Sequence, residues 1–340
     1  MKIETDILVI GAGPVGLFTV FEAGLLGLKC TLIDNLDKVG GQCSELYPEK
    51  PIYDIPAITE CTGKDLTDNL LQQIKPFKAN FHFSERVEEV TQDKNNWIIK
   101  TNKNKKFTAP NIIIAGGVGS FEPRKLSLKE AEKFEGKSVF YSVTNKEILK
   151  NKNISIFGGG DSALDWALEL SNTSNVTLIH RRDEFRGAPH TLSEIKKLQK
   201  KGKISIKTPC QLTSIEGDKT INAIEIKYDD EKNEKIKTDV ILSFFGLIMK
   251  LGPITEWGLN IDKKVISVNT NNFETNKSGI FAVGDICTYP GKLKLILSGF
   301  HEVALASVEC FKRARPKEKF RFEFTTSSKT IQERLGKLKK

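Results

Sequence analysis

The first part of the chain carries a glycine motif together with the strand and the helix that such a motif needs. The apolar, β-branched run over residues 6–10 predicts a buried strand, and the residues up to about Leu26 predict a helix. Three glycines occupy the junction in a G-x-G-x-x-G pattern, namely Gly11, Gly13 and Gly16. Glycine lets the backbone approach a pyrophosphate, and a helix N-terminus offers free N–H groups and a positive dipole end. This stretch predicts a dinucleotide-binding unit; the alternative is a helix entry that only packs tightly.

An acid and a structured loop follow this motif. A second predicted strand over residues 29–33 ends at Asp34, where a carboxylate would bind a ribose hydroxyl. The loop over residues 35–56 is rich in proline and glycine, and such loops at the carboxyl ends of parallel strands are where ligands bind. Four of its residues suit a ligand: Gly40 and Gly41 for close backbone approach, Gln42 for hydrogen bonding to a heterocycle, and Tyr47 for stacking on one. The alternative is an ordinary proline-rich turn.

A second glycine motif repeats this pattern in the middle of the chain. Residues 154–157 predict a strand, a helix follows the glycines, and residues 176–179 predict the next strand. The motif GGGDSA contains Gly158, Gly160, Asp161 and Ser162. Two such units, well separated along the chain, indicate two nucleotide-binding domains.

The two units differ at the end of their second strand. The first strand of this kind ends in Asp34, whereas the second ends at His180 and is followed by Arg181, Arg182 and Arg186. A carboxylate would repel a ribose 2′-phosphate, and guanidinium groups bind it bidentately. We therefore expect NADPH in preference to NADH at the second site; the alternative is a solvated basic turn.

The remaining segments complete an α/β pattern. Short strands within residues 80–109 and 204–240 predict two antiparallel meanders, and apolar strands occupy 112–115 and the run that ends at Asp285. A last helix is expected over 298–313. We expect an α/β fold with two Rossmann-like, three-layer ββα domains, each with a small antiparallel meander, and a C-terminal tail.

The positive charge of the chain is concentrated at its C-terminal end. The formal net charge is +9, and residues 312–340 contain eleven Lys or Arg and three Glu. This distribution indicates an acidic partner near the C-terminus, with a solvated, frayed tail as the alternative. No recognition motif accompanies the charge, so nucleic acid is not an expected partner.

The other side-chain patterns exclude several classes of protein. The six cysteines form no C-x-x-C and the four histidines form no metal-spaced pair, so we expect no metal site and mostly buried, inert thiols. No apolar run reaches the length of a membrane span, and the first strand begins without a signal peptide. We expect a cytoplasmic protein that does not bind membranes.

In this order of motifs, the chain resembles the flavoproteins that carry two dinucleotide-binding domains. The motifs are GAGPVG with Asp34, AGG at 115–117, GGGDSA, HRRDEFR and the T-x9-D that ends at Asp285. Thioredoxin reductases carry C-x-x-C just before the second glycine motif, where this chain reads YSVTN. Glutathione-reductase-like enzymes need a second cysteine where this chain has Pro48. The chain therefore most resembles the thioredoxin-reductase-like ferredoxin–NADP⁺ reductases, which lack a dithiol.

This resemblance implies a set of cofactor contacts. Residues carried over for FAD are Asp34, Gln42, Tyr47, Val87, Phe121, Asp285 and, on the tail, Thr326 or Ser327. Together with the glycines of the first motif and Gly41, these residues would hold FAD, with Tyr47 on one face of the flavin. The NADP(H) site would use the GGGDSA residues with His180 and the three arginines. The family is homodimeric, so the resemblance also implies a dimer whose tail reaches the flavin region of the partner subunit.

The resemblance also implies domain boundaries. We expect an FAD-binding domain over 1–117 and 278–340, an NADPH-binding domain over 122–270, and hinge linkers at 118–121 and 271–277.

The implied activity is hydride exchange between NADP(H) and FAD, with single electrons passed to or from ferredoxin or flavodoxin. No acid, base or nucleophile is needed, because the flavin performs the chemistry. One alternative is an NADPH-dependent reductase of free flavin, quinone or iron, and another is a flavin-binding redox sensor without turnover.

Overall fold

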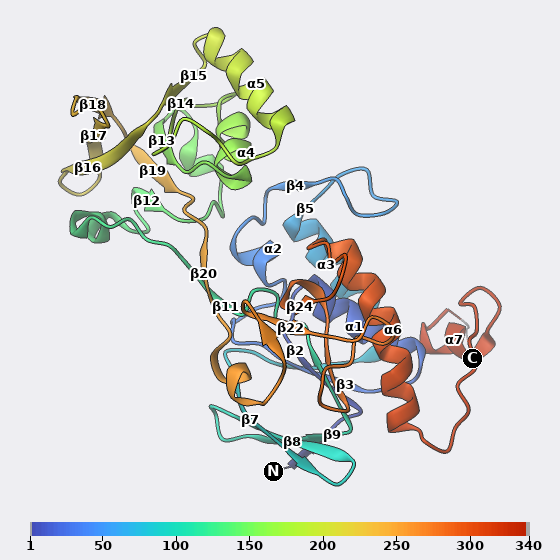
Figure 1. Ribbon diagram of the computed structural model, residues 1–340. Helices are drawn as coiled ribbons and strands as arrows, with labels where there is room; N and C mark the ends of the chain where they lie inside the picture. Colours follow the sequence, from blue (N-terminus) through green and yellow to red (C-terminus); the bar gives the residue numbers. More distant parts are fainter. Residues whose placement is uncertain (1, 338–340) are drawn as a thin grey trace. The chain divides into compact units, whose positions relative to one another are not determined.

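The computed structural model describes residues 2–337, which form two compact units (Figure 1). The first unit joins residues up to 121 with residues from 249 onward, and the second covers 122–248. The chain crosses between them at β11 (Ser120–Pro123) and β20 (Leu247–Lys250), which pair as a two-stranded sheet.

The expected boundary of the second domain at residue 270 is wrong. Residues 249–270 belong to the first unit, and the return crossing lies at β20 rather than at 271–277. The physical reason is core packing: Leu251 and Ile254 join an apolar cluster of the first unit, and the indole N–H of Trp257 donates to the carbonyl oxygen of Glu88 at 3.1 Å.

The centre of the first unit is a parallel sheet in the order β23-β10-β2-β3-β6. Apart from the edge strand β6, these strands are mostly apolar and rich in β-branched residues, which suits burial on both faces. Their bounds are β2 (Ile7–Ile10), β3 (Cys30–Ile33), β6 (Asn80–His82), β10 (Asn111–Ile114) and β23 (Ile280–Ala282). Alternate side chains enter different cores, since Ile7 and Val9 pack with the helices while Leu8 packs on the opposite face.

Helices cover one face of this sheet and a meander covers the other (Figure 1). The helices are α1 (Pro14–Leu25), α3 (Gly63–Ile74) and α6 (Ile296–Ala314). The meander sheet has the order β1-β9-β8-β7, with β1 (Lys2–Glu4), β7 (Val87–Asp93), β8 (Asn96–Thr101) and β9 (Lys106–Ala109). This arrangement confirms the predicted three-layer ββα unit.

The second unit repeats the same plan with a shorter set of elements. Its parallel sheet has the order β12-β19-β13-β14-β15, with β12 (Val139–Phe140), β13 (Asn153–Phe157), β14 (Asn175–Ile179), β15 (Ile204–Lys207) and β19 (Val240–Ser243). Two helices pack on one face, α4 (Asp161–Leu170) and α5 (Pro189–Lys200). On the other lies an antiparallel meander of β16 (Cys210–Gly217), β17 (Ile221–Tyr228) and β18 (Asn233–Lys237).

Short elements connect these layers. In the first unit they are α2 (Gln42–Glu45), β4 (Pro51–Ile52), β5 (Cys61–Thr62), β21 (Ile261–Asp262), β22 (Val265–Ser267) and β24 (Cys287–Thr288). The described residues also contain five 3₁₀ helices across the two units: η1 (Lys75–Phe77), η2 (Lys129–Phe134), η3 (Glu147–Leu149), η4 (Gly252–Glu256) and η5 (Gly284–Ile286). Across residues 2–337, the structure holds no helix that is both long and apolar enough to cross a membrane.

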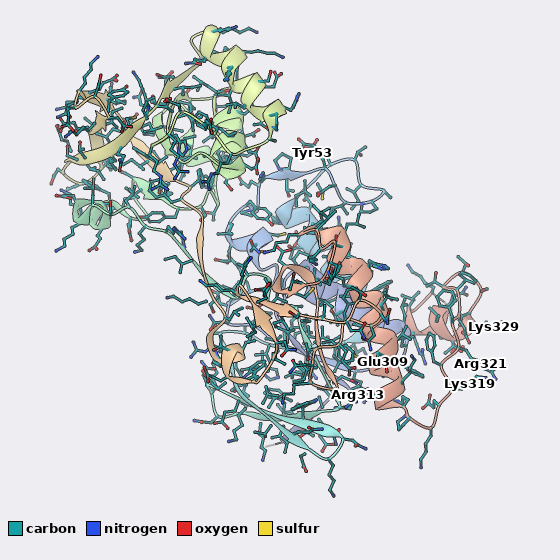
Figure 2. The ribbon with its side chains drawn as sticks, in the orientation of Figure 1. Tyr53, Glu309, Arg313, Lys319, Arg321 and Lys329 are labelled. Carbon is teal, nitrogen blue, oxygen red and sulfur yellow. The ribbon has the colours of Figure 1, made fainter. Side chains whose placement is uncertain are left out.

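The C-terminal tail ends in a short helix, α7 (Lys329–Arg334), that returns to the first unit. Ile331 is buried, and the Arg334 guanidinium donates to the carbonyl oxygen of Leu25 at 2.6 Å. Between α6 and α7 the chain stays open: Phe322 is 72% exposed and Phe324 is 67% exposed, with their rings edge to face. The segment with Phe322 and Phe324 therefore forms no strand, and Lys319, Arg321 and Lys329 are exposed around it (Figure 2).

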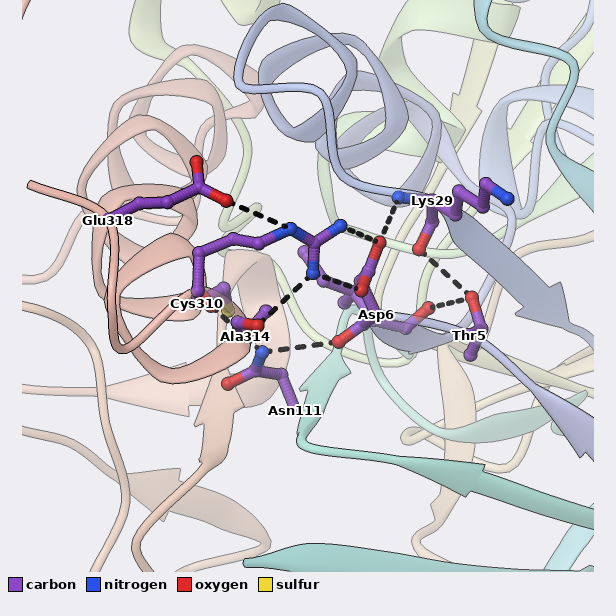
Figure 3. A network of polar contacts seen from close by, with 9 residues as sticks. Thr5, Asp6, Lys29, Asn111, Cys310, Ala314 and Glu318 are labelled. Atoms are coloured by element: carbon purple, nitrogen blue, oxygen red, sulfur yellow. Dashed lines mark hydrogen bonds and ion pairs between the residues drawn. The ribbon is translucent and has the colours of Figure 1, made fainter. Parts of the chain in front are cut away.

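An ion pair fixes the point where the tail leaves α6 (Figure 3). Both terminal nitrogens of Arg315 donate to the Asp6 carboxylate, at 2.7 and 3.0 Å. Asp6 also accepts the Lys29 N–H at 2.8 Å, and the Asn111 amide bridges the carbonyl oxygens of Asp6 and Cys310. Burial alone would raise the pKa of Asp6, but the bonds from Arg315 and Lys29 outweigh it and lower that pKa. The contacts tie the end of α6 to the first strands of the sheet.

Candidate functional site

The first glycine motif forms a tight turn at Gly11, Gly13 and Gly16, which we call the first glycine cradle. A side chain at Gly11 or Gly16 would collide with neighbouring backbone atoms. A Cβ atom built on Gly11 would lie 2.5 Å from the carbonyl oxygen of Ala115, and one on Gly16 would lie 1.9 Å from that of Gly11. Helix α1 thus packs directly against the end of β2, with Gly13 at its N-cap and Pro14 in its first turn. Its first N–H groups stay available at the carboxyl end of the sheet, as a pyrophosphate site requires.

The loop after Asp34 closes over this cradle. Gly41 has a φ of 54°, and a Cβ atom on it would lie 3.1 Å from the Cα of Gly13. A Cβ atom on Gly117 would lie 3.4 Å from the amide nitrogen of Gln42. Residues far apart in sequence, from α1, α2 and the end of β10, therefore meet at one point. This places Gln42 beside the glycine cradle.

Asp34 is held rigidly at the end of β3. Its carboxylate accepts the Ala12 N–H at 2.6 Å on one oxygen and the Leu36 N–H at 2.8 Å on the other. Burial raises its pKa, and these two bonds offset part of the rise. The backbone of Asp34 also pairs with the segment before β7, because the Glu85 N–H donates to its carbonyl oxygen at 2.9 Å. Val87, which is buried at the start of β7, follows Glu85 by two residues, so this pairing brings the start of β7 toward Asp34.

Tyr47 and Asp285 belong to the same region. The Tyr47 hydroxyl lies 3.7 Å from the Cys43 sulfur, and burial, then Cys43 and Asp285, raise the pKa of Tyr47. Asp285 sits on η5, and burial raises its pKa while Lys292 and Lys294 oppose the rise. The Asp285 carboxylate is among the groups that raise the pKa of Tyr47, so the two side chains share one electrostatic environment.

The second glycine motif is closed by the arginine-bearing loop. A Cβ atom on Gly158 would lie 2.9 Å from that of Ala163, and Gly160 is the N-cap of α4. The Arg186 N–H donates to the carbonyl oxygen of Gly159 at 2.7 Å, and Asp161 accepts the Ala188 N–H at 2.7 Å. The backbone of the loop is therefore bonded to the motif at Gly159 and at the Asp161 side chain, and Ser162 is exposed in the first turn of α4.

The charged side chains of this loop remain available. His180 packs on Gly159, and its pKa is lowered by burial, then by Arg181 and Arg182. The side chains of Arg181, Arg182 and Arg186 are exposed. The His180 ring thus lies against the glycine turn, while the three guanidinium groups are exposed on the loop that follows it.

Two tail residues predicted for FAD lie away from the first cradle within one chain. Thr326 and Ser327 are exposed just before α7, and α7 contacts Leu25 at the C-terminal end of α1. The glycine cradle is at the other end of this 12-residue helix, about 18 Å away. The side chain of Phe121 lies outside the described residues, so its prediction stays open.

Sequence reasoning missed the buried pair of Lys292 and Glu302. Glu302 has 0% exposure on α6 and its carboxylate accepts the Gly284 N–H at 2.6 Å. The available signal was a glutamate on the apolar face of a predicted helix, which usually indicates a partner from elsewhere in the chain. Among the described residues, no cluster of His, Cys, Asp or Glu could hold a metal ion.

Comparison with known proteins identifies the family of this chain. Residues 5–307 match the family model described as pyridine nucleotide-disulphide oxidoreductase. A ferredoxin–NADP reductase of Pelagibacter ubique is 66% identical over 98% of this chain and 99% of its own length. One of Parvibaculum lavamentivorans is 49% identical over 98% of each chain.

Solved structures show the same fold. The thioredoxin reductase of T. acidophilum superposes with a TM-score of 0.77 at 23% identity, over 91% of this chain and 98% of its own. That of Lactococcus lactis gives 0.76 at 24% identity, over 92% and 99%. The expected resemblance is confirmed, and the chain belongs to the pyridine nucleotide-disulphide oxidoreductase family.

Proposed function

We propose that this chain is a ferredoxin–NADP⁺ reductase that binds FAD in its first unit and NADP(H) in its second. The observation that carries the proposal is the contrast between its two glycine cradles. One has a carboxylate, Asp34, fixed at the end of its second strand. The other has exposed arginines at the equivalent place. The names of its relatives, which match this chain over nearly its whole length, support the same activity.

The first unit fits FAD. The N–H groups at the start of α1 would hold the pyrophosphate, and Asp34 keeps lone pairs for a ribose hydroxyl beyond its two backbone bonds. Gln42 and Asp285 would hydrogen-bond the flavin end, and Tyr47 would cover one face of the ring. Bound FAD would supply two-electron exchange with a nicotinamide and one-electron exchange with a protein carrier. The residues of the chain would bind it, orient it and keep water from that face.

The second unit fits NADP(H) rather than NAD(H). The first turn of α4, with Gly160, Asp161 and Ser162, would face the pyrophosphate. Arg181 and Arg182, whose side chains are exposed, would bind the 2′-phosphate. His180 would pack beside the bound nucleotide, since its ring lies against Gly159 and burial, then Arg181 and Arg182, lower its pKa.

The cysteines favour an external electron carrier over a thiol relay. All six are free and buried. Cys43, the one nearest Tyr47, has a pKa raised to about 11 by burial, which keeps it protonated at neutral pH. Exchange of thiols with a disulfide substrate needs an accessible thiolate, so electrons would leave through a ferredoxin or flavodoxin instead.

The basic tail supports an acidic carrier. Lys319, Arg321 and Lys329 are exposed along it (Figure 2), and positive patches of this kind accelerate association with acidic proteins. The position of Thr326 and Ser327, distant from the first cradle of their own chain, supports a homodimer in which each tail reaches the flavin region of the partner subunit.

Purification followed by three assays tests the proposal. The protein should retain FAD or take it up, its absorbance near the usual flavin band of about 450 nm should be bleached by NADPH, and cytochrome c reduction should depend on added ferredoxin. A colourless protein that takes up no FAD would contradict the proposal. Rapid NADPH oxidation with free flavin, quinone or iron but not with ferredoxin would instead identify a diaphorase, and FAD binding without turnover would identify a sensor.

A further inference from the structure

Glu302 lies on the buried face of α6 and accepts four bonds from the segment that follows β23. Its Oε2 accepts the Gly284 N–H at 2.6 Å and the Cys287 thiol at 3.5 Å. Its Oε1 accepts the Tyr289 hydroxyl at 2.8 Å and the Lys292 ammonium. A buried carboxylate is tolerated only when its charge is paired and its oxygens are hydrogen-bonded, and Glu302 meets both conditions.

Lys292 supplies the compensating charge. Only 5% of its side chain is exposed, and its ammonium lies 5.4 Å from the centre of the Tyr289 ring. Burying a lysine costs free energy that a surface position would not. The pair therefore needs an explanation beyond stability, since two apolar side chains would fill the same space at lower cost.

The pair lies directly behind Asp285. Gly284 and Asp285 are consecutive on η5, and Glu302 holds the N–H of the first. The turn has no slack, because a Cβ atom on Gly299 of α6 would lie 2.4 Å from a methyl group of Val15 and 3.4 Å from the Cα of Gly284. Movement of Glu302 would thus displace the turn that presents Asp285 beside the first glycine cradle.

We propose that the Lys292–Glu302 pair is a positioning device for the flavin end of FAD. Glu302 fixes the turn that carries Asp285, and Lys292 cancels the charge that Glu302 would otherwise place beneath the cofactor. The inference rests on the proposed binding of FAD to the first unit. It predicts effects of opposite sign for the two residues, which a purely structural pair would not produce.

The sign follows from the charge that each variant leaves behind. Glu302→Gln leaves the Lys292 cation unpaired, which stabilises the electron-rich, reduced form of the cofactor and raises its midpoint potential. Lys292→Met leaves the Glu302 anion unpaired and lowers it. The double variant removes both charges and should return the potential to that of the wild type. Tyr289→Phe removes one bond to Glu302 without changing charge and should leave the potential unchanged.

Affinity gives a second readout. In apoprotein titrations followed by FAD fluorescence, each single variant should bind FAD about tenfold more weakly, because the loss of one charge-assisted bond loosens the turn. Lys292→Arg, which keeps the charge, should recover most of the affinity. Controls come from exposed ion pairs of the same unit: Glu309→Gln on α6 and Lys64→Met on α3 should change neither FAD affinity nor potential.

The outcomes separate this inference from the proposed function. A wild-type protein that takes up no FAD contradicts the proposed function itself. If the wild type binds FAD, the inference fails when both single variants bind within twofold of it, or when their potentials coincide or shift in the same direction. Circular dichroism and thermal unfolding identify any variant that does not fold. In that case two milder single variants test the inference: Lys292→Arg should retain its FAD affinity, and Tyr289→Phe should bind FAD more weakly.

Discussion

Replacement of Gly41 by alanine is a direct test of the first glycine cradle. Gly41 is the N-cap of α2 with φ 54° and ψ −129°, a combination that is essentially confined to glycine. In addition, the new Cβ would lie 3.1 Å from the Cα of Gly13, in the space between the loop and the start of α1. Gly41→Ala therefore perturbs both the backbone and the surface that a pyrophosphate would contact.

The expected magnitude has two parts. Backbone strain of this kind costs about 1–3 kcal/mol, which corresponds to a decrease in Tm of about 2–12 °C for a unit of roughly 200 residues. The intruding Cβ should also raise the Kd for FAD at least about tenfold, or about 1.4 kcal/mol. At an FAD concentration of about 100 times the wild-type Kd, ligand stabilisation should fall from about 2.7 to about 1.4 kcal/mol.

Thermal unfolding of the apoprotein with and without FAD measures both parts. The matched control is Gly252→Ala in the same unit, where φ is 59° and a Cβ would meet nothing within 4 Å. It should lose stability through the backbone alone and keep the full increase in Tm on FAD addition. Equal stabilisation by FAD of the Gly41→Ala variant and this control would show that the cradle has been misassigned.

Three further predictions address the other sites. Replacing Arg181 and Arg182 by alanine should raise KM for NADPH about tenfold or more and change that for NADH little; equal effects on both would refute the 2′-phosphate site. Asp6→Asn should lower the free energy of unfolding by about 1–2 kcal/mol at neutral pH. The pKa of Asp6 is lower in the folded than in the unfolded protein. Its contribution to the free energy of unfolding is therefore present above the unfolded-state pKa and is lost as the pH falls through the folded-state pKa. In strong acid, chemical unfolding should find the variant and the wild type equally stable. Added salt should slow the reduction of ferredoxin but not of ferricyanide, and parallel salt curves would exclude a role for the basic tail.

The glycine motifs and the ends of the second strands were predictable from sequence because each is encoded by neighbouring residues. G-x-G-x-x-G requires backbone approach at one turn, and Asp34 or His180 follows from counting along one strand. The structure places these residues as the local pattern indicates. Their ligands stay a prediction.

Pairing between distant segments was not predictable in the same way. The meander was expected to begin at residue 80, yet Asn80–His82 joins the parallel sheet and the first meander strand after it begins at Val87. The break is held by Glu85, which accepts bonds from Thr101 at 2.6 Å and from Lys105 at 2.8 Å. A short apolar run does not determine which sheet it joins, because strand pairing depends on partners far away in sequence.

The assignment of residues 249–270 failed for a related reason. Leu251 and Trp257 carry apolar surface, but that surface does not specify which of two neighbouring cores will bury it. Likewise, Glu302 is an acid at a helical core position, and the sequence alone does not show that it forms an ion pair with Lys292, which lies in a loop ten residues earlier.

The interrupted first unit imposes an order on synthesis at the ribosome. Its sheet needs β23 and its helical layer needs α6, and both lie beyond residue 248, after the whole of the second unit. Since domains fold as their residues emerge, the second unit can complete itself while the first still waits for its final strand. A nascent chain stalled at this stage would expose the edge of β10 and the uncovered side of α1 to chaperones. These surfaces become buried only when β23 and α6 have been synthesised and have packed against them.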